Sequence, residues 1–266
     1  MKEYTITQWD KAAESYSRVQ AKSPVARFNR EFIRQLVPDM TDKHVLDAGC
    51  GDGYYADHFS KQGALVKGCD GSAVMVSIAQ QKYPLVQFDV VDLQEHLPYQ
   101  NQEFDVVFCN LVLMDIEKIE TSIAEMARVL KTGGMFIFSI LHPCFYLGKW
   151  ETDKLGRKTY RKILNYLEPQ TKELVFWGET IHYHRPLSYY LNLMTQSKLW
   201  LEQLHEPAMV DIDFNDYYKS VPTRIRIRLW ERIFAAKHFL FNTQPKEYHT
   251  PSARIPFLLF ACLIKH

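Results

Sequence analysis

The feature that most constrains this chain is a glycine-rich loop between a short apolar segment and a helical segment. The apolar segment covers residues 44–47, and the loop that follows it reads Gly49-Cys50-Gly51-Asp52-Gly53. Glycine has no Cβ, so glycines at alternate positions let the backbone turn tightly and approach a ligand closely. A strand that runs through such a loop into a helix predicts an α/β protein with a ligand site at the loop.

The same alternation of apolar and helical segments continues to residue 141. Further strands are expected over residues 65–69, 86–90, 104–110 and 135–141. Helices are expected between them, over residues 54–61, 72–83 and 119–130. Strands that alternate with helices favour a parallel, doubly wound sheet, in which right-handed crossovers bring the loops after the strands to one edge. Ligands bind at that edge.

The two ends of the chain are less regular. Helices are expected over residues 7–19, where Thr7 and Asp10 resemble a capping box, and over residues 24–36. Residues 142–186 show no clear period. The remaining expected elements are a helix over 187–200, strands over 201–205 and 255–264, and a basic helix over 223–239.

The spacing of the glycine loop distinguishes between ligands. A dinucleotide site has the pattern G-x-G-x-x-G, whereas this loop has G-x-G-x-G and carries Asp47 two positions before its first glycine. That carboxylate would repel a pyrophosphate and attract a cation such as an α-amino group. No G-K-[ST] follows the loop, so a P-loop is excluded. A strand-to-helix turn without any ligand is the alternative.

Acidic residues at the ends of the next two strands suit a nucleoside. Asp70 ends the second expected strand, 19 residues after Gly51, where a carboxylate can accept both hydroxyls of a ribose. Asp89 ends the third, where its carboxylate could accept the exocyclic amine of adenine and the N–H of Val90 could meet a ring nitrogen. Asp92, three residues further on, is the rival acceptor for that amine.

Four segments of the first half carry a family resemblance. They read V-L-D-A-G-C-G-D-G, C-D-G-S-A-V-M, F-D-V-V-D-L and R-V-L-K-T-G-G-M-F-I-F-S. In this order they resemble the class I S-adenosylmethionine-dependent methyltransferases of the small-molecule, type 11/25-like group, over residues 9–141. The resemblance implies a Rossmann-like seven-stranded sheet, with 201–205 as its sixth strand and 255–264 as an antiparallel seventh. It also implies S-adenosyl-L-methionine as cofactor, S-adenosyl-L-homocysteine as product, and lid insertions after strand 5 and between strands 6 and 7.

The same resemblance implies which residues contact the cofactor. They are Tyr16, Asp47, Gly49, Gly51, Asp70, Gly71, Met75, Asp89, Val90, Asn110 and Leu111. Asp47 and the two loop glycines would hold the methionine end, with the backbone of Asn110 below it. Met75 would pack against the adenine, and Tyr16 would close over the cofactor. Family members often have threonine or serine where Asp52 stands, so no side-chain contact is carried over for that residue.

The resemblance also divides the chain, which it implies to be a single methyltransferase domain over 1–266. Residues 1–40 would form an N-terminal helical cap, residues 41–141 the cofactor-binding core, and residues 142–187 and 207–253 insertions over the substrate. Aromatic residues are 14% of the chain but ten of the 49 residues over 142–190. That local excess favours an apolar or aromatic pocket wall over a solvated loop.

Three residues are candidates for contact with the methyl acceptor, which needs a base where it carries a proton. His142 lies in H-P-C-F directly after the fifth strand, a stretch similar to one in some uncharacterised family members. Tyr183 and His184 lie in Y-H-R-P-L-S, which resembles the segment before the pocket-facing helix. A structural role is the alternative for each. No metal is expected, because His182 and His184 have no matching cluster of ligands.

Charge and composition bear on partners and location. The net charge is +1, and N-L-V-L stands at 110–113 in place of an N-P-P-Y motif, so nucleic acid is not expected as a partner. The basic stretch over 224–237 is interpreted as a solvated helix face. Five cysteines without a CxxC pair, no apolar leader and no apolar run beyond ten residues indicate a cytoplasmic protein without a membrane span. It is expected to be a monomer or homodimer.

We therefore expect an enzyme that moves a methyl group from S-adenosylmethionine to an oxygen or nitrogen atom of a small aromatic or apolar metabolite. Two alternatives stay open. One is an RNA or protein methyltransferase that uses the basic helix. The other is a non-catalytic or regulatory protein that only binds S-adenosylmethionine.

Overall fold

The computed structural model describes residues 2–20, 22–156, 158–175, 178–207 and 258–266. The expected helix over 223–239, its basic stretch over 224–237 and nearly all of the expected insertion over 207–253 lie outside these residues. No helix of the described part is both long and apolar enough to cross a membrane.

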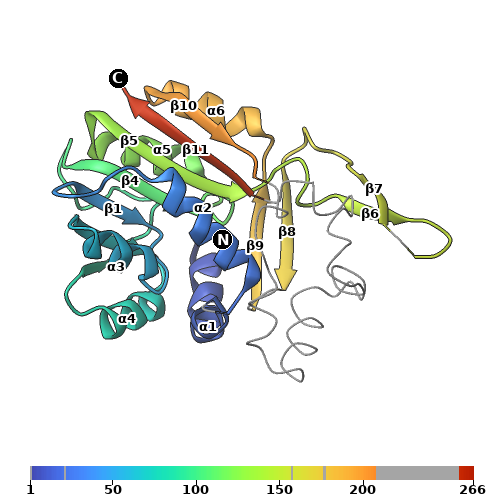
Figure 1. The fold of residues 1–266 in the computed structure, drawn as a ribbon, viewed down its shortest axis with the longest axis horizontal. Coiled ribbons are helices and arrows are strands. Elements are labelled where there is room, and N and C mark those ends of the chain that lie inside the picture. The colour runs from blue at the N-terminus through green and yellow to red at the C-terminus, as the bar shows by residue number, and fades with distance from the viewer. Residues whose placement is uncertain (1, 21, 157, 176–177, 208–257) are drawn as a thin grey trace.

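A sheet of seven strands forms the centre of the molecule (Figure 1). Its strands are β1 (His44–Ala48), β2 (Leu65–Asp70), β3 (Gln87–Val90), β4 (Phe104–Asn110), β5 (Leu130–Leu141), β10 (Leu199–His205) and β11 (Leu258–Lys265). Their order is β10-β11-β5-β4-β1-β2-β3, with β1 to β5 parallel and β11 antiparallel to both of its neighbours. The expected Rossmann-like, seven-stranded α/β fold is therefore confirmed, including its antiparallel last strand.

Helices cover both faces of this sheet because its central strands are apolar on both sides. The helices are α1 (Lys2–Gln20), α2 (Pro24–Leu36), α3 (Tyr54–Lys61), α4 (Ala73–Lys82), α5 (Ile119–Val129) and α6 (Leu187–Gln196). On β5, Phe138 packs on the face covered by α5 and α6, whereas its neighbour Ile137 packs on the face covered by α2 and α3. The expected helix over 187–200 ends at Gln196, because Lys198, with a φ of +60°, turns the chain into β10.

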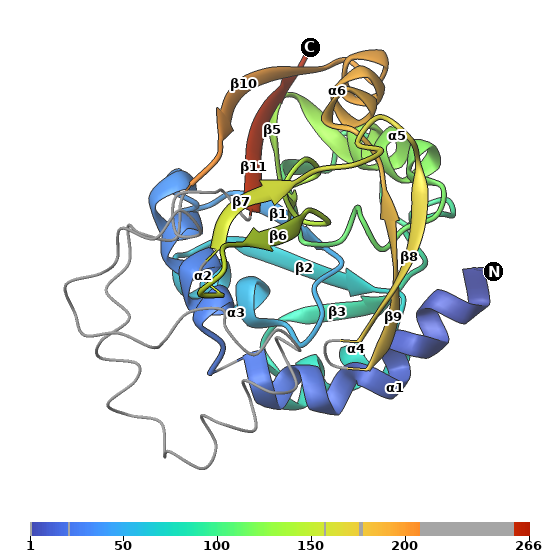
Figure 2. The same ribbon diagram turned by 90° about the vertical axis from the view of Figure 1, so that its right-hand side faces the viewer.

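The expected capping box at Thr7 and Asp10 lies inside the first helix, which already includes Lys2, and the carboxylate of Asp10 instead contacts the start of α4. Its Oδ1 accepts hydrogen bonds from Ser72 Oγ at 2.6 Å and from the Val74 N–H at 3.3 Å, at the start of α4. Ser72 Oγ in turn accepts the N–H of Met75 at 3.1 Å. These contacts hold α1 beside α4, across the end of β2 (Figure 2).

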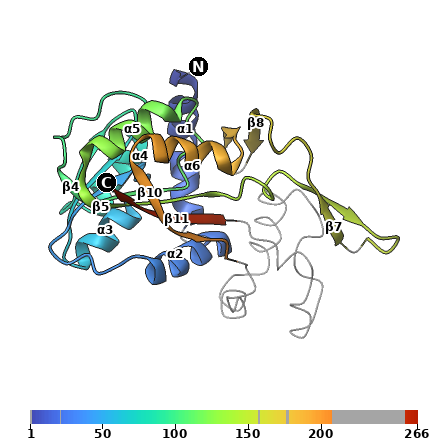
Figure 3. The same ribbon diagram turned by 90° about the horizontal axis from the view of Figure 1, so that it is seen from above.

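The segment after β5 is built from two β-hairpins, which the sequence did not predict. They pair β6 (Lys149–Thr152) with β7 (Lys158–Lys162), and β8 (Gln170–Val175) with β9 (Glu179–His184). Half-buried and exposed residues alternate along β8, because only one side of this ribbon faces the rest of the molecule. The β6–β7 hairpin projects away from the sheet (Figure 3), whereas β9 lies beside α1 at the carboxyl edge (Figure 1).

Candidate functional site

The glycine loop adopts a backbone that favours glycine. Gly49, Gly51 and Gly53 have φ values of +77°, +52° and +83°, in the left-handed region. A Cβ on Gly49 would also lie 2.3 Å from Cγ2 of Val112. The N–H of Gly49 donates to the carbonyl oxygen of Cys69 at 2.8 Å, so the loop is fixed to the end of β2.

Asp70 ends β2 with each carboxylate oxygen facing one backbone donor. Oδ2 accepts the N–H of Gly51 and Oδ1 accepts the N–H of Ser72, both at 2.9 Å. Each oxygen of a carboxylate has two lone pairs, so each can accept one more hydrogen bond. Asp70 lines a first cavity at the carboxyl edge. The other expected cofactor contacts in its lining are Tyr16, Gly49, Gly51, Gly71, Met75, Asn110 and Leu111.

The structure places Asp89 and Val90 away from the lining of this cavity. The carboxylate of Asp89 is bound by Tyr99, whose hydroxyl donates to Oδ2 at 3.0 Å. Val90 is 56% exposed. Asp92 and Leu93, which follow the end of β3, line the cavity instead. Asp92, the alternative acceptor for the adenine amine, is therefore the carboxylate at the end of β3 that a ligand in the first cavity could reach.

The side chain of Asp47, near the end of β1, is a buried carboxyl group. It is 2% exposed, and its Oδ2 has no hydrogen-bond partner among the described residues. Burial raises its pKa to about 8, chiefly because the charged form loses its hydration. A bound cation would restore the ionised form, so this residue fits an ammonium group of a ligand.

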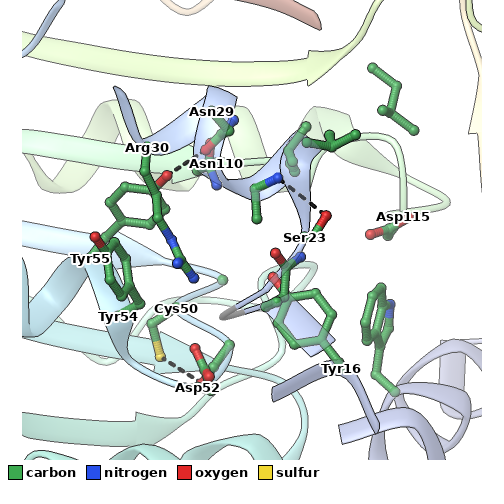
Figure 4. Close-up of a pocket in the computed structure, with 18 of the residues that line it drawn as sticks. Tyr16, Ser23, Asn29, Arg30, Cys50, Asp52, Tyr54, Tyr55, Asn110 and Asp115 are labelled. Carbon is green, nitrogen blue, oxygen red and sulfur yellow. Dashed lines mark hydrogen bonds between the residues drawn. The ribbon is translucent and has the colours of Figure 1, made fainter. Parts of the chain in front are cut away.

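A second cavity is lined by Asp47 and by a cationic side chain that the sequence analysis did not single out. The guanidinium carbon of Arg30 lies 3.9 Å from the centroid of the Tyr54 ring, in cation–π contact. Figure 4 shows both side chains at the cavity, across it from Asp115. A carboxylate and a guanidinium in one cavity match the two charged groups of an amino acid.

Asn110 holds the end of β4 against the neighbouring elements. Its Oδ1 accepts hydrogen bonds from Asn29 Nδ2 of α2 at 3.0 Å and from Ser139 Oγ of β5 at 2.6 Å. Leu111, which follows it, has a φ of +58°. Asn110 and Leu111 line both cavities, so the turn after β4 forms part of the wall where the two meet.

Tyr16 and Asp52 join α1 to the glycine loop. Tyr16 lines both cavities, and burial raises the pKa of its phenol. Asp52 Oδ2 accepts a hydrogen bond from Ser17 Oγ at 2.9 Å and lies 2.7 Å from Nζ of Lys82 in α4. Asp52, to which the resemblance gave no contact, therefore fixes two helices to the loop.

The structure does not bring His142 to these cavities. Its Nε2 lies 2.6 Å from Oε1 of Glu206, and its Nδ1 accepts the N–H of Cys144 at 3.2 Å. Both ring nitrogens therefore face protein groups, and His142 is absent from the lining of the first, second and third cavities. Its contacts are those of a residue that fixes the chain after β5.

Tyr183 and His184 line a third, smaller cavity beneath β9. Nε2 of His184 lies 2.9 Å from the carbonyl oxygen of Tyr166, and Tyr183 is buried. This third cavity shares Met114, Leu141 and His182 with the second cavity, so the two adjoin.

His182 and Asp115 form a buried pair that the sequence analysis missed. Nε2 of His182 lies 3.1 Å from Oδ1 of Asp115, although 67 residues separate them in the chain. No local pattern signals a pair at this separation, and His182 was considered only as a metal ligand. Within the described residues, no three His, Cys, Asp or Glu side chains converge as a metal site would require.

Comparisons with known proteins find similar sequences and a similar fold among methyltransferases. Residues 46–138 match the model of a family described as "Methyltransferase domain". A malonyl-[acyl-carrier protein] O-methyltransferase of Hamiltonella defensa is 31% identical over 133 residues, 50% of this chain and about half the length of that relative. A ubiquinone biosynthesis O-methyltransferase of Histophilus somni is 27% identical over 65% of this chain and 78% of its own. An S-adenosylmethionine-dependent methyltransferase structure from Mesorhizobium loti shares the fold, with a TM-score of 0.67 and 22% identity over 92% of this chain and 100% of its own.

Proposed function

We propose that this chain, whose residues 46–138 match a methyltransferase domain, is a class I, S-adenosylmethionine-dependent methyltransferase that methylates an oxygen or nitrogen atom of a small aromatic or apolar metabolite. One observation carries the proposal. The first cavity, with Asp70, and the second, with Asp47 and Arg30, meet at the glycine loop. A nucleoside joined to an amino acid would fill the two together.

The residues present fit S-adenosylmethionine. Asp47 would bind the α-ammonium group, and Arg30 would bind the α-carboxylate. Asp70 would accept the ribose hydroxyls with its remaining lone pairs. Asp92 would accept the adenine amine, with the N–H of Leu93 beside the ring, in place of the Asp89 and Val90 that the sequence suggested.

When bound, the sulfonium of this cofactor supplies an already activated methyl group. The protein then has to align the acceptor with it and exclude water, which in well-oriented systems can lower a barrier by about 7–11 kcal/mol. Tyr16, from the proposed N-terminal cap over residues 1–40, covers the junction of the cavities from one side. The first insertion, over 142–187, contributes Thr180 and His182 to the wall of the second cavity.

The acceptor would occupy the junction of the second and third cavities. Met114 and Leu141 line both of these cavities, and Tyr146 and Tyr190 add aromatic walls to the third, which is also lined by Lys172, His184 and Arg185. Two of the curated relatives are named O-methyltransferases, which supports oxygen ahead of nitrogen as the acceptor atom. The excess of aromatic residues over 142–190 supports an aromatic or apolar acceptor.

The cofactor site is tested by calorimetry with S-adenosylmethionine and S-adenosylhomocysteine. Asp70→Ala should weaken both at least tenfold, because it removes the acceptors for the ribose hydroxyls. Asp57→Ala, which removes a carboxylate paired with Lys61 on α3, is the matched control. Undiminished affinity in Asp70→Ala would contradict the ribose assignment.

Two further measurements separate the alternatives. Retention on immobilised RNA that falls steeply with salt would favour an RNA methyltransferase. Tight cofactor binding without methyl transfer to any compound of a broad metabolite panel would favour a non-catalytic binding protein.

A further inference from the structure

We propose that the junction of the first two cavities is a cation site that distinguishes S-adenosylmethionine from S-adenosylhomocysteine, with Asp115 as the carboxylate that binds the sulfonium charge. The inference rests on the proposed function, because it concerns the same cofactor. It adds a residue that determines which form of the cofactor is held. It is carried by the position of Asp115 among the residues that both cavities share.

The described residues common to both cavities define this junction. They are Trp9, Tyr16, Gly49, Gly51, Asn110, Leu111 and Asp115. Asp115 is the only acidic or basic residue among them. A ligand whose nucleoside fills the first cavity and whose amino acid fills the second has its sulfur atom between these two parts. The sulfonium charge of such a ligand would therefore lie beside Asp115.

The carboxylate of Asp115 has no cationic partner among the described residues. The side chain is 8% exposed, and its Oδ1 lies 3.1 Å from Nε2 of His182 without a hydrogen bond. Burial lowers the pKa of His182 to about 4, so that ring is neutral at neutral pH and supplies no counter-charge. Because Oδ1 is buried, Oδ2 is the oxygen that faces a ligand in the cavity. Figure 4 shows Asp115 at the second cavity, across it from Arg30.

Two aromatic rings of α1 complete the junction. Trp9 and Tyr16 lie about two helical turns apart, so both side chains leave the same face of the helix. Their ring centroids are 5.6 Å apart, and the rings are nearly perpendicular, at 88°. The negative faces of aromatic rings attract cations, and sites for onium ligands are built from such rings. A carboxylate and two aromatic rings together favour a charged sulfonium over an uncharged thioether.

The fold fixes Asp115 by contacts on both sides of it in the chain. Before it, the carbonyl oxygen of Met114 accepts the N–H of Tyr183 at 2.7 Å. After it, the carbonyl oxygen of Ile116 accepts a hydrogen bond from the buried guanidinium of Arg185 at 2.8 Å. The loop after β4 is therefore held against β9 and the residues that follow it, and the carboxylate is preorganised beside the junction.

A bound cation changes the ionisation of Asp115. Burial raises its pKa well above the ordinary value, and the charge of Asp70 adds to the effect. The empty site therefore favours the protonated carboxyl group, whereas a sulfonium favours the ionised form. S-adenosylhomocysteine carries no charge on sulfur and leaves the proton in place. Binding of S-adenosylmethionine should therefore release more protons than binding of S-adenosylhomocysteine.

The other titratable groups around Asp115 do not account for such a difference. They are Tyr16 of α1, Asp70 of β2, Cys109 of β4, Tyr146, His182 of β9 and Tyr190 of α6. Burial raises the pKa of each tyrosine and of the cysteine, so they stay neutral with either ligand. Asp70 and the more distant Asp47 would meet the ribose and the α-ammonium group, which both ligands share.

The site also links the methyl transfer to release of the product. When the methyl carbon bonds to the acceptor, the electron pair of the carbon–sulfur bond stays on sulfur, which loses its positive charge. Asp115 then has no cation beside it and takes up a proton from solvent. The product is therefore held less tightly than the donor, and inhibition by S-adenosylhomocysteine is weak.

The test measures the affinity of three ligands by calorimetry at mildly alkaline pH. They are S-adenosylmethionine, S-adenosylhomocysteine and sinefungin, which carries an ammonium group in place of the sulfonium methyl. The parent should bind the two cations at least about tenfold more tightly than S-adenosylhomocysteine. In Asp115→Asn this preference should fall below about threefold, with the affinity for S-adenosylhomocysteine within about threefold of the parent. Asp57→Asn, which alters a carboxylate paired with Lys61 on α3, is the matched control and should keep the preference.

Two further measurements keep the proposal testable if Asp115→Asn does not fold. Trp9→Leu should narrow the preference of the parent about threefold, because it removes one ring from the junction. Calorimetry in buffers of different ionisation enthalpy should show greater proton release for S-adenosylmethionine than for S-adenosylhomocysteine in the parent, with no such difference in Asp115→Asn.

Three results would overturn the inference. They are a parent that binds S-adenosylhomocysteine as tightly as the two cations, an unchanged preference in Asp115→Asn, and equal proton release with both ligands in the parent. A parent that binds neither S-adenosylmethionine nor S-adenosylhomocysteine would instead overturn the proposed function.

Discussion

Replacing Asp47 by asparagine should make the ligand-free protein more stable while it weakens cofactor binding. The carboxyl group has a pKa of about 8 in the fold, against 3.8 for its ordinary value. Between these values the folded state holds the proton that the unfolded state has lost, so stability falls as pH rises through this window. Each pH unit within the window lowers the free energy of unfolding by about 1.4 kcal/mol. At neutral pH, roughly three units above the lower value, the cost is on the order of 4 kcal/mol.

The amide of Asp47→Asn does not ionise, so the variant does not lose this part of its free energy of unfolding as pH rises. We expect its free energy of unfolding at neutral pH to exceed that of the parent, with the advantage shrinking as pH falls toward the ordinary pKa of an aspartate. Thermal or chemical denaturation of the ligand-free proteins across pH measures both expectations.

The same ionisation predicts how binding depends on pH. An ammonium group binds the ionised carboxylate, which is the minor form of Asp47 below its pKa of about 8. The affinity of the parent for S-adenosylhomocysteine should therefore rise about tenfold for each unit of pH up to that pKa. Calorimetry should show weaker binding without this slope in Asp47→Asn, whereas Asp57→Asn should behave like the parent. A less stable Asp47→Asn protein, or an unchanged slope in its affinity, would refute the reasoning.

Three further predictions concern the glycine loop, the adenine end of the first cavity and the buried His182. Gly49→Ala should abolish detectable S-adenosylhomocysteine binding in calorimetry, because its Cβ would lie 2.3 Å from Val112 Cγ2 and its φ is +77°; binding within threefold of the parent would contradict this. Asp92→Ala should weaken S-adenosylhomocysteine binding more than Asp89→Ala does. A larger loss in Asp89→Ala would instead favour Asp89 as the acceptor for the adenine amine. Acidification from the ordinary histidine pKa of 6.5 toward about 4 should destabilise the parent, because the unfolded chain protonates His182 and the fold does not. In denaturation experiments, His182→Gln should lose less stability than the parent over this pH range. The same loss of stability in both proteins would argue against the lowered pKa of His182.

The sequence determined the part of the protein that depends on local chain geometry. Strand, glycine loop and helix follow one another directly over residues 44–61, and glycine is the residue type that permits the positive φ found at Gly49 and Gly51. Asp47 and Asp70 end adjacent parallel strands, so the fold class alone brings them to one edge. The antiparallel last strand came from the family resemblance, because no local pattern specifies that pairing.

Only the tertiary structure decided which side chains meet across long separations. Asp10 caps α4 and not its own helix, since α1 packs beside that helix. Asp92 lines the first cavity in place of Asp89, because the Tyr99 hydroxyl holds the latter. The hairpin that carries His182 has an irregular apolar pattern, and its place is set by hydrogen bonds to the loop after β4. A side chain's partner across the fold depends on the packing of whole elements, and that packing is not written in any short stretch of residues.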